Sequence, residues 1–258
     1  MRVKVKCELL KKEKIIDGIY KFSVKAPDIA KDAKPGQFLE AKVSETGEPF
    51  LRRPISIFNI NGDMIEFIFQ VKGRGTELLA EREEGDLIDI MGPLGFGTFK
   101  VQEYGKVAII GGGIGTYPLY ELAKELKDKA DVTMYMGFRN KDLVTLEKEF
   151  EEVSNKLVLT TDDGSYKEKG FAINFLKEDC KKEKPDMIFA CGPLPMLKAV
   201  KEFATQEDIH CQISLEERMG CGIGACLGCA VKVKDGENFK YLHVCKEGPV
   251  FNAKDVEI

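Results

Sequence analysis

Residues 217–230 read Glu-Arg-Met-Gly-Cys-Gly-Ile-Gly-Ala-Cys-Leu-Gly-Cys-Ala and hold three of the eight cysteines of the chain. Four residues separate Cys221 from Cys226, two separate Cys226 from Cys229, and Cys245 follows after a longer interval. This is the C-x4-C-x2-C…C spacing of plant-type [2Fe–2S] clusters. The interleaved glycines favour a tight loop, because a residue without Cβ reaches positive φ and lets backbone amides approach sulfur. The spacing therefore predicts an iron–sulfur site with these four cysteines as ligands.

Two other interpretations of these cysteines stay open. Structural zinc also takes four cysteines, although usually as two short C-x2-C pairs, and only one such pair is present here. Disulfides would need an oxidising compartment, whereas the first residues alternate like a strand and do not form the apolar run of a signal peptide. The alternative from a different functional class is a zinc-stabilised binding module without a redox role.

Length and composition are those of an ordinary globular chain. At 258 residues the chain is long enough for two domains with separate cores. Its 39 Lys and Arg residues against 43 Asp and Glu residues give a net charge of −4, and no basic block predicts nucleic-acid binding. No apolar run is long enough to span a bilayer. We therefore expect no membrane association and a cytoplasmic location.

The first hundred residues carry a pattern of short strands. Residues 19–24, 38–43 and 64–71 are rich in β-forming side chains, and 64–71 alternates apolar with polar residues. The turn Asn61-Gly-Asp63 precedes the alternating segment and suits a hairpin. Closely spaced strands without intervening helices predict a small antiparallel barrel over residues 1–100.

Two segments of this predicted barrel carry candidate binding chemistry. Arg53-Pro-Ile-Ser56 offers a planar guanidinium that suits a phosphate or stacks on a ring. Lys72-Gly-Arg-Gly-Thr76 opens a helical stretch, where its glycines would expose backbone amides to a pyrophosphate. Taken alone, each segment is equally an ordinary strand start or turn.

The pattern changes in the middle of the chain. Val107-Ala-Ile-Ile110 is an apolar run typical of a strand buried on both faces, and it leads into a glycine-rich loop at 111–118. Helically spaced apolar residues follow, so the order is that of a nucleotide-binding strand–loop–helix unit. A second strand end, Cys191-Gly-Pro193, meets a helix in the same way. Alternation of strands and helices predicts an α/β parallel-sheet domain over residues 101–215.

The glycine loop differs from the common G-x-G-x-x-G dinucleotide motif. Pro118 stands where the last glycine would be, and no acidic residue follows the predicted strand 132–136. Arg139 stands near that strand end, where it is either a partner for a 2′-phosphate or a solvated loop residue. A conventional ribose-binding carboxylate is therefore not predicted.

Taken together, these segments resemble the ferredoxin–NADP reductase superfamily, in which a flavin barrel precedes a nicotinamide domain. With Ser214–Cys221 and Cys245–Phe251 added, the chain resembles the family of dihydroorotate dehydrogenase B electron-transfer subunits over essentially its full length. The resemblance implies FAD, one [2Fe–2S] cluster and NAD as cofactors. It also implies an FMN-containing dihydroorotate dehydrogenase catalytic subunit as partner, in a heterotetramer of pyrimidine biosynthesis.

The same resemblance assigns cofactor contacts. Arg53–Ser56 corresponds to the flavin motif, with Ser56 near the flavin N5, and Gly75-Thr76 to the flavin-pyrophosphate turn. The two glycine loops correspond to the nicotinamide site. The implied cofactor-binding residues are Arg53, Pro54, Ile55, Ser56, Gln70, Val71, Lys72, Gly75, Thr76, Gly111, Gly112, Gly113, Gly115, Thr116, Cys191, Gly192 and Pro193. No catalytic acid, base or nucleophile is expected, because the cofactors carry the chemistry.

The predicted fold is α+β and multi-domain, with an N-terminal antiparallel β-barrel (1–100), an α/β parallel-sheet nicotinamide domain (101–215) and a small C-terminal [2Fe–2S] loop module (216–258). The alternative function is that of a related FAD/[2Fe–2S] subunit of an NAD(P)H–ferredoxin transhydrogenase or a sulfide dehydrogenase. Cys221 favours the first function, because some of those relatives carry a carboxylate there.

Apolar residues near the cysteines form a candidate docking surface for the partner, with a small core under the loop as the alternative. They are Met219, Ile223, Leu227, Val250 and Phe251.

Overall fold

The computed structural model of the chain describes residues 2–44 and 47–258. The chain divides into two compact units. Unit 1 comprises Met1–Thr98, Glu216–Val231 and Leu242–Pro249, and unit 2 comprises Phe99–Leu215, Lys232–Tyr241 and Val250–Ile258. The C-terminal segment is thus shared between the units. The division into three domains at residues 100 and 215 stays a prediction.

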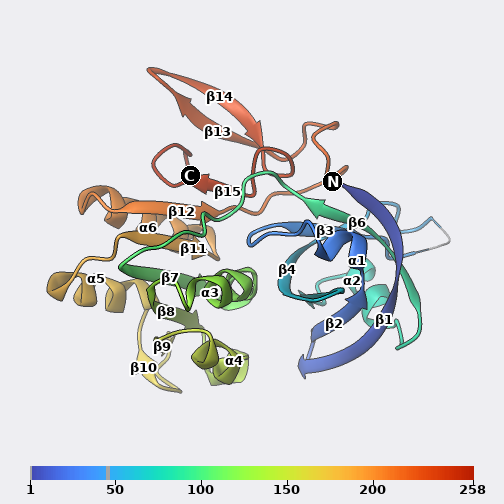
Figure 1. Cartoon of the computed structure of the whole chain (residues 1–258), viewed down its shortest axis with the longest axis horizontal. Coiled ribbons are helices and arrows are strands. Elements are labelled where there is room, and N and C mark those ends of the chain that lie inside the picture. The colour runs from blue at the N-terminus through green and yellow to red at the C-terminus, as the bar shows by residue number, and fades with distance from the viewer. Residues whose placement is uncertain (1, 45–46) are drawn as a thin grey trace. The chain divides into compact units, whose positions relative to one another are not determined.

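Unit 1 contains a closed antiparallel barrel with the strand order β1-β2-β5-β4-β3-β6 (Figure 1). Its strands are β1 Val3–Ile16, β2 Ile19–Lys25, β3 Phe38–Ala41, β4 Arg53–Asn61, β5 Met64–Gln70 and β6 Leu87–Leu94. Two short helices, α1 Pro27–Ala30 and α2 Arg74–Ala80, belong to the same part of the chain. In β5 the alternating residues Ile65, Phe67 and Phe69 are buried, because successive side chains of a strand point to opposite faces. The predicted barrel is confirmed.

Unit 2 is built on a seven-stranded sheet with the order β10-β9-β8-β7-β11-β12-β15. Its strands are β7 Lys106–Gly112, β8 Asp131–Phe138, β9 Lys156–Thr161, β10 Glu168–Lys169, β11 Met187–Cys191, β12 His210–Ser214 and β15 Val250–Asn252. All neighbours pair in parallel except β12 and β15, which are antiparallel. The predicted parallel-sheet domain is confirmed, with one antiparallel strand added at its edge.

Helices cover both faces of this sheet, with α3 and α4 on one side and α5 and α6 on the other (Figure 1). The helical segments are η1 Gly113–Leu119, α3 Tyr120–Leu126, η2 Lys141–Leu143, α4 Glu147–Glu152, α5 Ala172–Lys182 and α6 Leu194–Gln206. Val107 and Ile109 pack on one face of β7 while Ala108 and Ile110 are buried on the other. A strand covered on both faces explains the uninterrupted apolar run.

Three details differ from the sequence-based expectations. The glycine loop continues as the 3₁₀ segment η1, which contains Pro118, so the α-helix begins only at Tyr120. The short helix α1 at Pro27–Ala30 lies between β2 and β3, where no helix was expected between the strands. Val250 and Phe251 are buried in β15, because they pair with Ser214 and Ile213 of β12.

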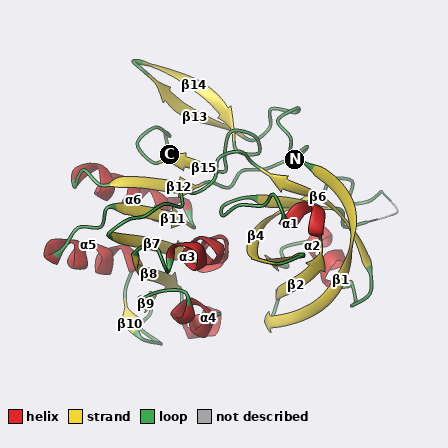
Figure 2. Ribbon diagram, in the orientation of Figure 1, coloured by secondary structure: helices red, strands yellow, loops and turns green. Residues whose placement is uncertain are grey.

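The C-terminal segment also forms a two-stranded hairpin, β13 Ala230–Asp235 and β14 Asn238–His243 (Figure 2). Among the residues described, no helix is both long and apolar enough to cross a membrane.

Candidate functional site

The predicted flavin motif begins β4. Ile55 points into the barrel core, whereas Arg53 and Ser56 are half-buried and Pro54 is exposed. The Arg53 guanidinium lies against the backbone of Gly75, where an ideal Cβ would fall 2.3 Å from Arg53 Nε. Any side chain at this position would displace the guanidinium. The structure therefore brings together the two segments that were predicted to bind flavin.

The turn between β5 and α2 is ordered by one hydroxyl. Thr76 Oγ1 accepts hydrogen bonds from the amides of Lys72 (2.9 Å) and Gly73 (3.3 Å), and it donates one to the Gly73 carbonyl (3.0 Å). Gln70 ends β5, and the amide of Val71 donates to the carbonyl of Gly18 (2.8 Å). Gln70, Val71 and Lys72 therefore lead directly into the turn that contacts Arg53.

The predicted nicotinamide residues meet at the carboxyl ends of two neighbouring strands. Cys191 of β11 pairs with Gly111 of β7, and the two glycine loops follow from these positions. An ideal Cβ on Gly115 would lie 2.4 Å from the Cα of Gly192, so two backbones touch there. The chain order reverses between β7 and β11, and open α/β sheets bind nucleotides at such a switch point.

The remaining predicted residues of this site lie at the same strand ends or in the loops that follow them. Thr116 is fully buried, and its hydroxyl donates to the Gly113 carbonyl at 2.8 Å. An ideal Cβ on Gly112 would fall 2.8 Å from Pro193 Cδ. The structure thus brings all eight predicted nicotinamide residues to the adjoining ends of β7 and β11 and into the loops that follow them.

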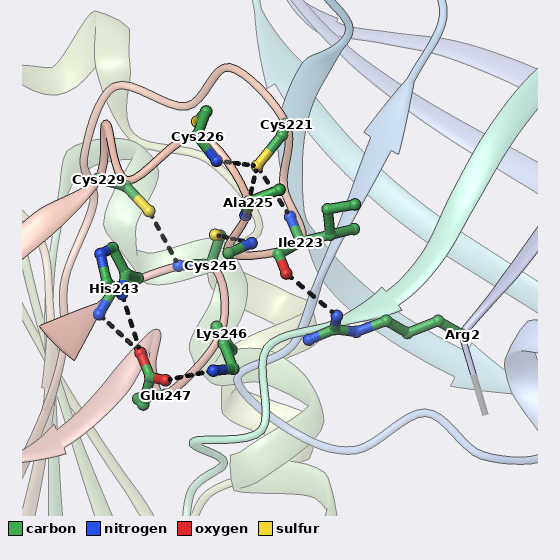
Figure 3. Close-up of polar contacts among 11 residues, drawn as sticks. Arg2, Cys221, Ile223, Ala225, Cys226, Cys229, His243, Cys245, Lys246 and Glu247 are labelled. Atoms are coloured by element: carbon green, nitrogen blue, oxygen red, sulfur yellow. Dashed lines mark hydrogen bonds and ion pairs between the residues drawn. The ribbon is translucent and has the colours of Figure 1, made fainter.

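The cysteine loop turns its amides toward sulfur (Figure 3). Cys221 Sγ accepts from the amides of Ile223 (3.5 Å), Ala225 (3.2 Å) and Cys226 (3.4 Å). The amide of Gly224 donates to Cys245 Sγ (3.1 Å), and that of Cys245 donates to Cys229 Sγ (3.4 Å). Such amide donors stabilise thiolates and cluster sulfur.

Positive backbone dihedrals let the loop curl around its sulfurs. Gly222 and Gly224 have φ of +68° and +83°, and Leu227 has +61°. The glycines suit these angles because they carry no Cβ. Cys226 is exposed while Cys229 and Cys245 are buried, so the loop reaches from the interior of unit 1 to its surface.

The thiols differ in acidity. Burial raises the pKa of the Cys221 thiol, but the amides of Ile223, Cys226 and Ala225 outweigh it and lower the pKa to about 6. Burial and the neighbouring Cys229 raise the pKa of Cys245 to about 12. Metal binding would therefore have to displace the Cys245 proton, because thiolates are the ligands.

Across residues 2–44 and 47–258, no three His, Cys, Asp or Glu side chains are grouped as a single metal ion requires. The fit to a two-iron cluster rests on the soft sulfur donors, their spacing and the amides directed at three of the four sulfurs. His243 Nδ1 lies 3.4 Å from Glu247 Oε2.

The cysteine loop packs on the barrel within unit 1. The amide of Phe96 donates to the Lys246 carbonyl (2.9 Å), and that of Gly97 donates to the Gly248 carbonyl (3.0 Å). An ideal Cβ on Gly222 would lie 2.7 Å from Glu40 Cγ in β3. All four cysteines therefore belong to the same compact unit as the predicted flavin motif.

Sequence reasoning missed two residues at this contact. Arg2 Nη1 donates to the Ile223 carbonyl at 3.3 Å, and Glu40 is 1% exposed beneath Gly222. Burial, opposed by Arg52 and reinforced by Cys221, raises the pKa of Glu40 to about 7. The available signal was Glu40 itself, a carboxylate among apolar neighbours in a predicted strand.

The remaining cysteines lie outside the loop. Cys7, Cys180, Cys191 and Cys211 are all buried. Burial raises the pKa of Cys7 and Cys180 to about 11 and that of Cys211 to about 12, as for thiols that fill a core.

Two family models match the chain. Residues 216–257 match the iron-sulfur cluster binding domain of dihydroorotate dehydrogenase B, and residues 109–202 match the oxidoreductase NAD-binding domain. The first range contains the cysteine loop, and the second contains both glycine loops. The two matches agree with the sites that the geometry indicates.

Several solved structures share the fold. The NADH-dependent reduced ferredoxin-NADP oxidoreductase, studied for flavin-based electron bifurcation, has a TM-score of 0.86 and 32% identity, over 98% of this chain and 90% of that chain. An Amycolatopsis cytochrome P450 reductase has a TM-score of 0.68 and 23% identity, over 81% of this chain and 69% of that chain, and it supports the fold alone.

Curated relatives match almost end to end. The dihydroorotate dehydrogenase B (NAD(+)) electron transfer subunit of Caldanaerobacter subterraneus subsp. tengcongensis is 39% identical and covers 99% of both chains. The protein of the same name from Bacillus velezensis is 42% identical and covers 95% of both chains. With two matching family models and these relatives, the chain belongs to the family of dihydroorotate dehydrogenase B electron transfer subunits.

Proposed function

We propose that this chain carries electrons between the FMN of a dihydroorotate dehydrogenase catalytic subunit and NAD, in pyrimidine biosynthesis. The chain is an oxidoreductase subunit with an electron-transfer role, and FAD, a [2Fe–2S] cluster and NAD are its cofactors. One observation supports the proposal most strongly. The cysteine loop and the flavin motif lie in one compact unit, although the sequence separates them by the whole nicotinamide domain.

Bound FAD would exchange two electrons with a nicotinamide and single electrons with a cluster, which connects the two kinds of carrier. Arg53 would supply the cation for the flavin phosphates, and the Lys72–Thr76 turn would hold them. Ser56, half-buried at the start of β4, would donate a hydrogen bond near the flavin N5. The contact between Arg53 and Gly75 supports the phosphate assignments, and the family resemblance supports that of Ser56.

The nicotinamide cofactor would bind the two glycine loops of unit 2. Gly111, Gly112, Gly113 and Gly115 allow a close approach of backbone to ligand, as the contact between Gly115 and Gly192 already shows for the two loops. Four thiolates, from Cys221, Cys226, Cys229 and Cys245, would hold the two irons.

The family implies a catalytic partner subunit. We propose that it binds FMN, that the complex is a heterotetramer, and that the location is cytoplasmic. The partner would dock around the exposed Cys226, where Ile223 and Leu227 are 41% and 62% exposed. Val250 and Phe251, also predicted for this surface, are buried in β15 and are excluded from it.

A second candidate function is that of a subunit in a ferredoxin-dependent transhydrogenase. The observation that favours it is the likeness to the NADH-dependent reduced ferredoxin-NADP oxidoreductase structure, which spans nearly all of both chains. The two functions share the cofactors and differ in the partner. The relatives named as dihydroorotate dehydrogenase subunits have the higher identity, which favours the first function.

The discriminating experiment uses the purified holoprotein with NAD and dihydroorotate. Alone, the chain is expected to reduce artificial dyes with NADH but to leave dihydroorotate unoxidised, because it holds no identified base for carbon–hydrogen oxidation. Adding an FMN-containing dihydroorotate dehydrogenase catalytic subunit should start dihydroorotate-dependent NAD reduction. NAD reduction from dihydroorotate by the chain alone, or no activity with the partner, would contradict the proposal. Activity only with reduced ferredoxin would support the second function.

A further inference from the structure

Unpartnered buried polar atoms are concentrated at one place in unit 1. Among the residues that the structure describes, three buried side-chain atoms lack a hydrogen-bond partner: Arg2 Nη2, Glu40 Oε1 and Glu40 Oε2. Folded proteins satisfy nearly all such groups, so each exception calls for a functional or structural reason. Both side chains lie against the same turn, Gly222-Ile223, directly after the predicted ligand Cys221.

Glu40 reaches the turn from β3. An ideal Cβ on Gly222 would fall 2.8 Å from Glu40 Oε1, so the carboxyl lies immediately beneath the loop backbone. Arg52 acts on this carboxyl through its charge but forms no ion pair with it, because Arg52 Nη2 pairs with Asp89 Oδ1 at 2.8 Å and Nη1 donates to the backbone carbonyl of Glu40. The carboxyl therefore faces the cluster loop without a counter-ion of its own.

Arg2 reaches the turn from the residue before β1. Its guanidinium lies 4.6 Å from the ring centroid of Phe96 and donates one hydrogen bond to the Ile223 carbonyl (Figure 3). A guanidinium stays ionised at every accessible pH, so it is a fixed positive charge beside the loop. Lys246 also contacts the loop, but its ammonium pairs with Glu247 Oε1 at 3.2 Å.

We propose that Glu40 and Arg2 are positioning residues that set the reduction potential of the cluster, in opposite directions. Reduction adds a negative charge to the cluster, so a nearby carboxylate opposes it and a nearby guanidinium favours it. Both carboxyl oxygens of Glu40 and Nη2 of Arg2 are buried, and solvent and salt screen buried charge least. This inference rests on the proposed cluster site.

The test is a redox titration of the holoprotein, in which the reduced cluster is followed by electron paramagnetic resonance and the flavin by absorbance. Glu40→Gln should raise the cluster midpoint potential, most at the alkaline end of a pH series, and Arg2→Met should lower it. Each shift should be on the order of tenfold in the reduction equilibrium, which is about 59 mV for one electron. The flavin midpoint should move less.

The chain offers matched controls. Glu217 and Arg218 are exposed, carry the same two charges and lie within four residues of Cys221. Glu217→Gln and Arg218→Met should leave the potential nearly unchanged, because solvent screens exposed charges. Glu40→Asp and Arg2→Lys keep the charges, so their cluster midpoint potentials should stay close to the wild-type value. This comparison separates the effect of charge from that of packing.

Several results would overturn the inference. The first is a change in cluster midpoint potential in Glu40→Gln or Arg2→Met that is no larger than the change in its control. The second is a change in the same direction in both variants. The third is an equally large change in the charge-keeping variants. If Glu40→Gln or Arg2→Met loses its iron, the charge-keeping variant at the same position is titrated instead. A cluster midpoint potential in that variant that differs from the wild-type value would also overturn the inference. A wild-type chain without a cluster signal would instead refute the proposed function itself.

Discussion

The two units build their proposed cofactor sites from different kinds of contact within the protein. In unit 2 the nucleotide loops are built from glycine and small residues, and backbones touch directly, as between Gly115 and Gly192. In unit 1 the corresponding segments are packed by charged side chains, Arg53 against Gly75 and Glu40 against Gly222. Both units are therefore sensitive to added volume at these glycines, and unit 1 is sensitive in addition to lost charge and lost sulfur.

The largest expected effect is the loss of one cluster ligand. Cys226→Ser should reduce the iron content from about two per chain to near zero, because an alcohol replaces a thiolate that bridges protein and iron. FAD should stay bound, and NADH should still reduce it, since the flavin motif uses other segments. Iron and flavin assays on the purified variant measure this.

The matched control is Cys180→Ser in α5 of unit 2, which should keep its iron. A Cys226→Ser protein that lost FAD as readily as iron would show that the two sites are not separable within unit 1.

The next effect concerns the flavin. Arg53→Ala should weaken FAD binding about tenfold to a hundredfold, because it removes a charge-assisted contact to phosphate. Lys31→Ala is the control, since Lys31 is an exposed cation of unit 1 that pairs with Asp28 at 3.0 Å. Equilibrium dialysis with FAD checks the difference, and equal losses in the two variants would remove Arg53 from the flavin site.

A smaller effect is expected in unit 2. Gly115→Ala places a methyl group 2.4 Å from the Cα of Gly192, so the loops must separate. Overpacking of this size should raise the KM for NADH about tenfold. Flavin and iron contents should be those of the wild type, because they belong to unit 1. A variant with a normal KM would show that these loops do not bind the nucleotide.

The smallest effect concerns docking. Leu227→Asp should weaken binding of the catalytic subunit by about tenfold or less, since one rim residue seldom dominates an interface. Leu227 is 62% exposed, so the fold should tolerate the change. Leu87→Asp, at a side chain 55% exposed in β6, is the control. Calorimetry with the purified partner gives both values, and equal binding by the two variants would place the partner elsewhere.

The sequence predicted the elements with local signals. The buried run at Val107–Ile110 and the alternation in 64–71 each depend on residues close together in the chain, and both strands are present. The burial of Val250 and Phe251 could not be predicted from residues close to them in the chain. They are buried because they pair with β12, a partner chosen by tertiary contact.

In the candidate site, too, local patterns could be predicted and tertiary contacts could not. The cysteine spacing and the glycine loops are local patterns, and the structure places their residues together. The roles of Glu40 and Arg2 depend on a loop that follows them by most of the chain length, so no local pattern could show them. The local sequence shows only that Glu40 is an unusual residue for its position, because it is a carboxylate between Leu39 and Ala41 of the barrel core.

The most direct measurement is anaerobic addition of NADH to the purified wild-type chain without any partner, with flavin absorbance and cluster paramagnetic resonance followed together. Because the flavin motif and the cysteine loop share unit 1, we expect the flavin band to bleach and the signal of one reduced cluster per FAD to appear. Bleaching of the flavin without any cluster signal, in protein that holds about two irons per chain, would contradict electron transfer between the two sites.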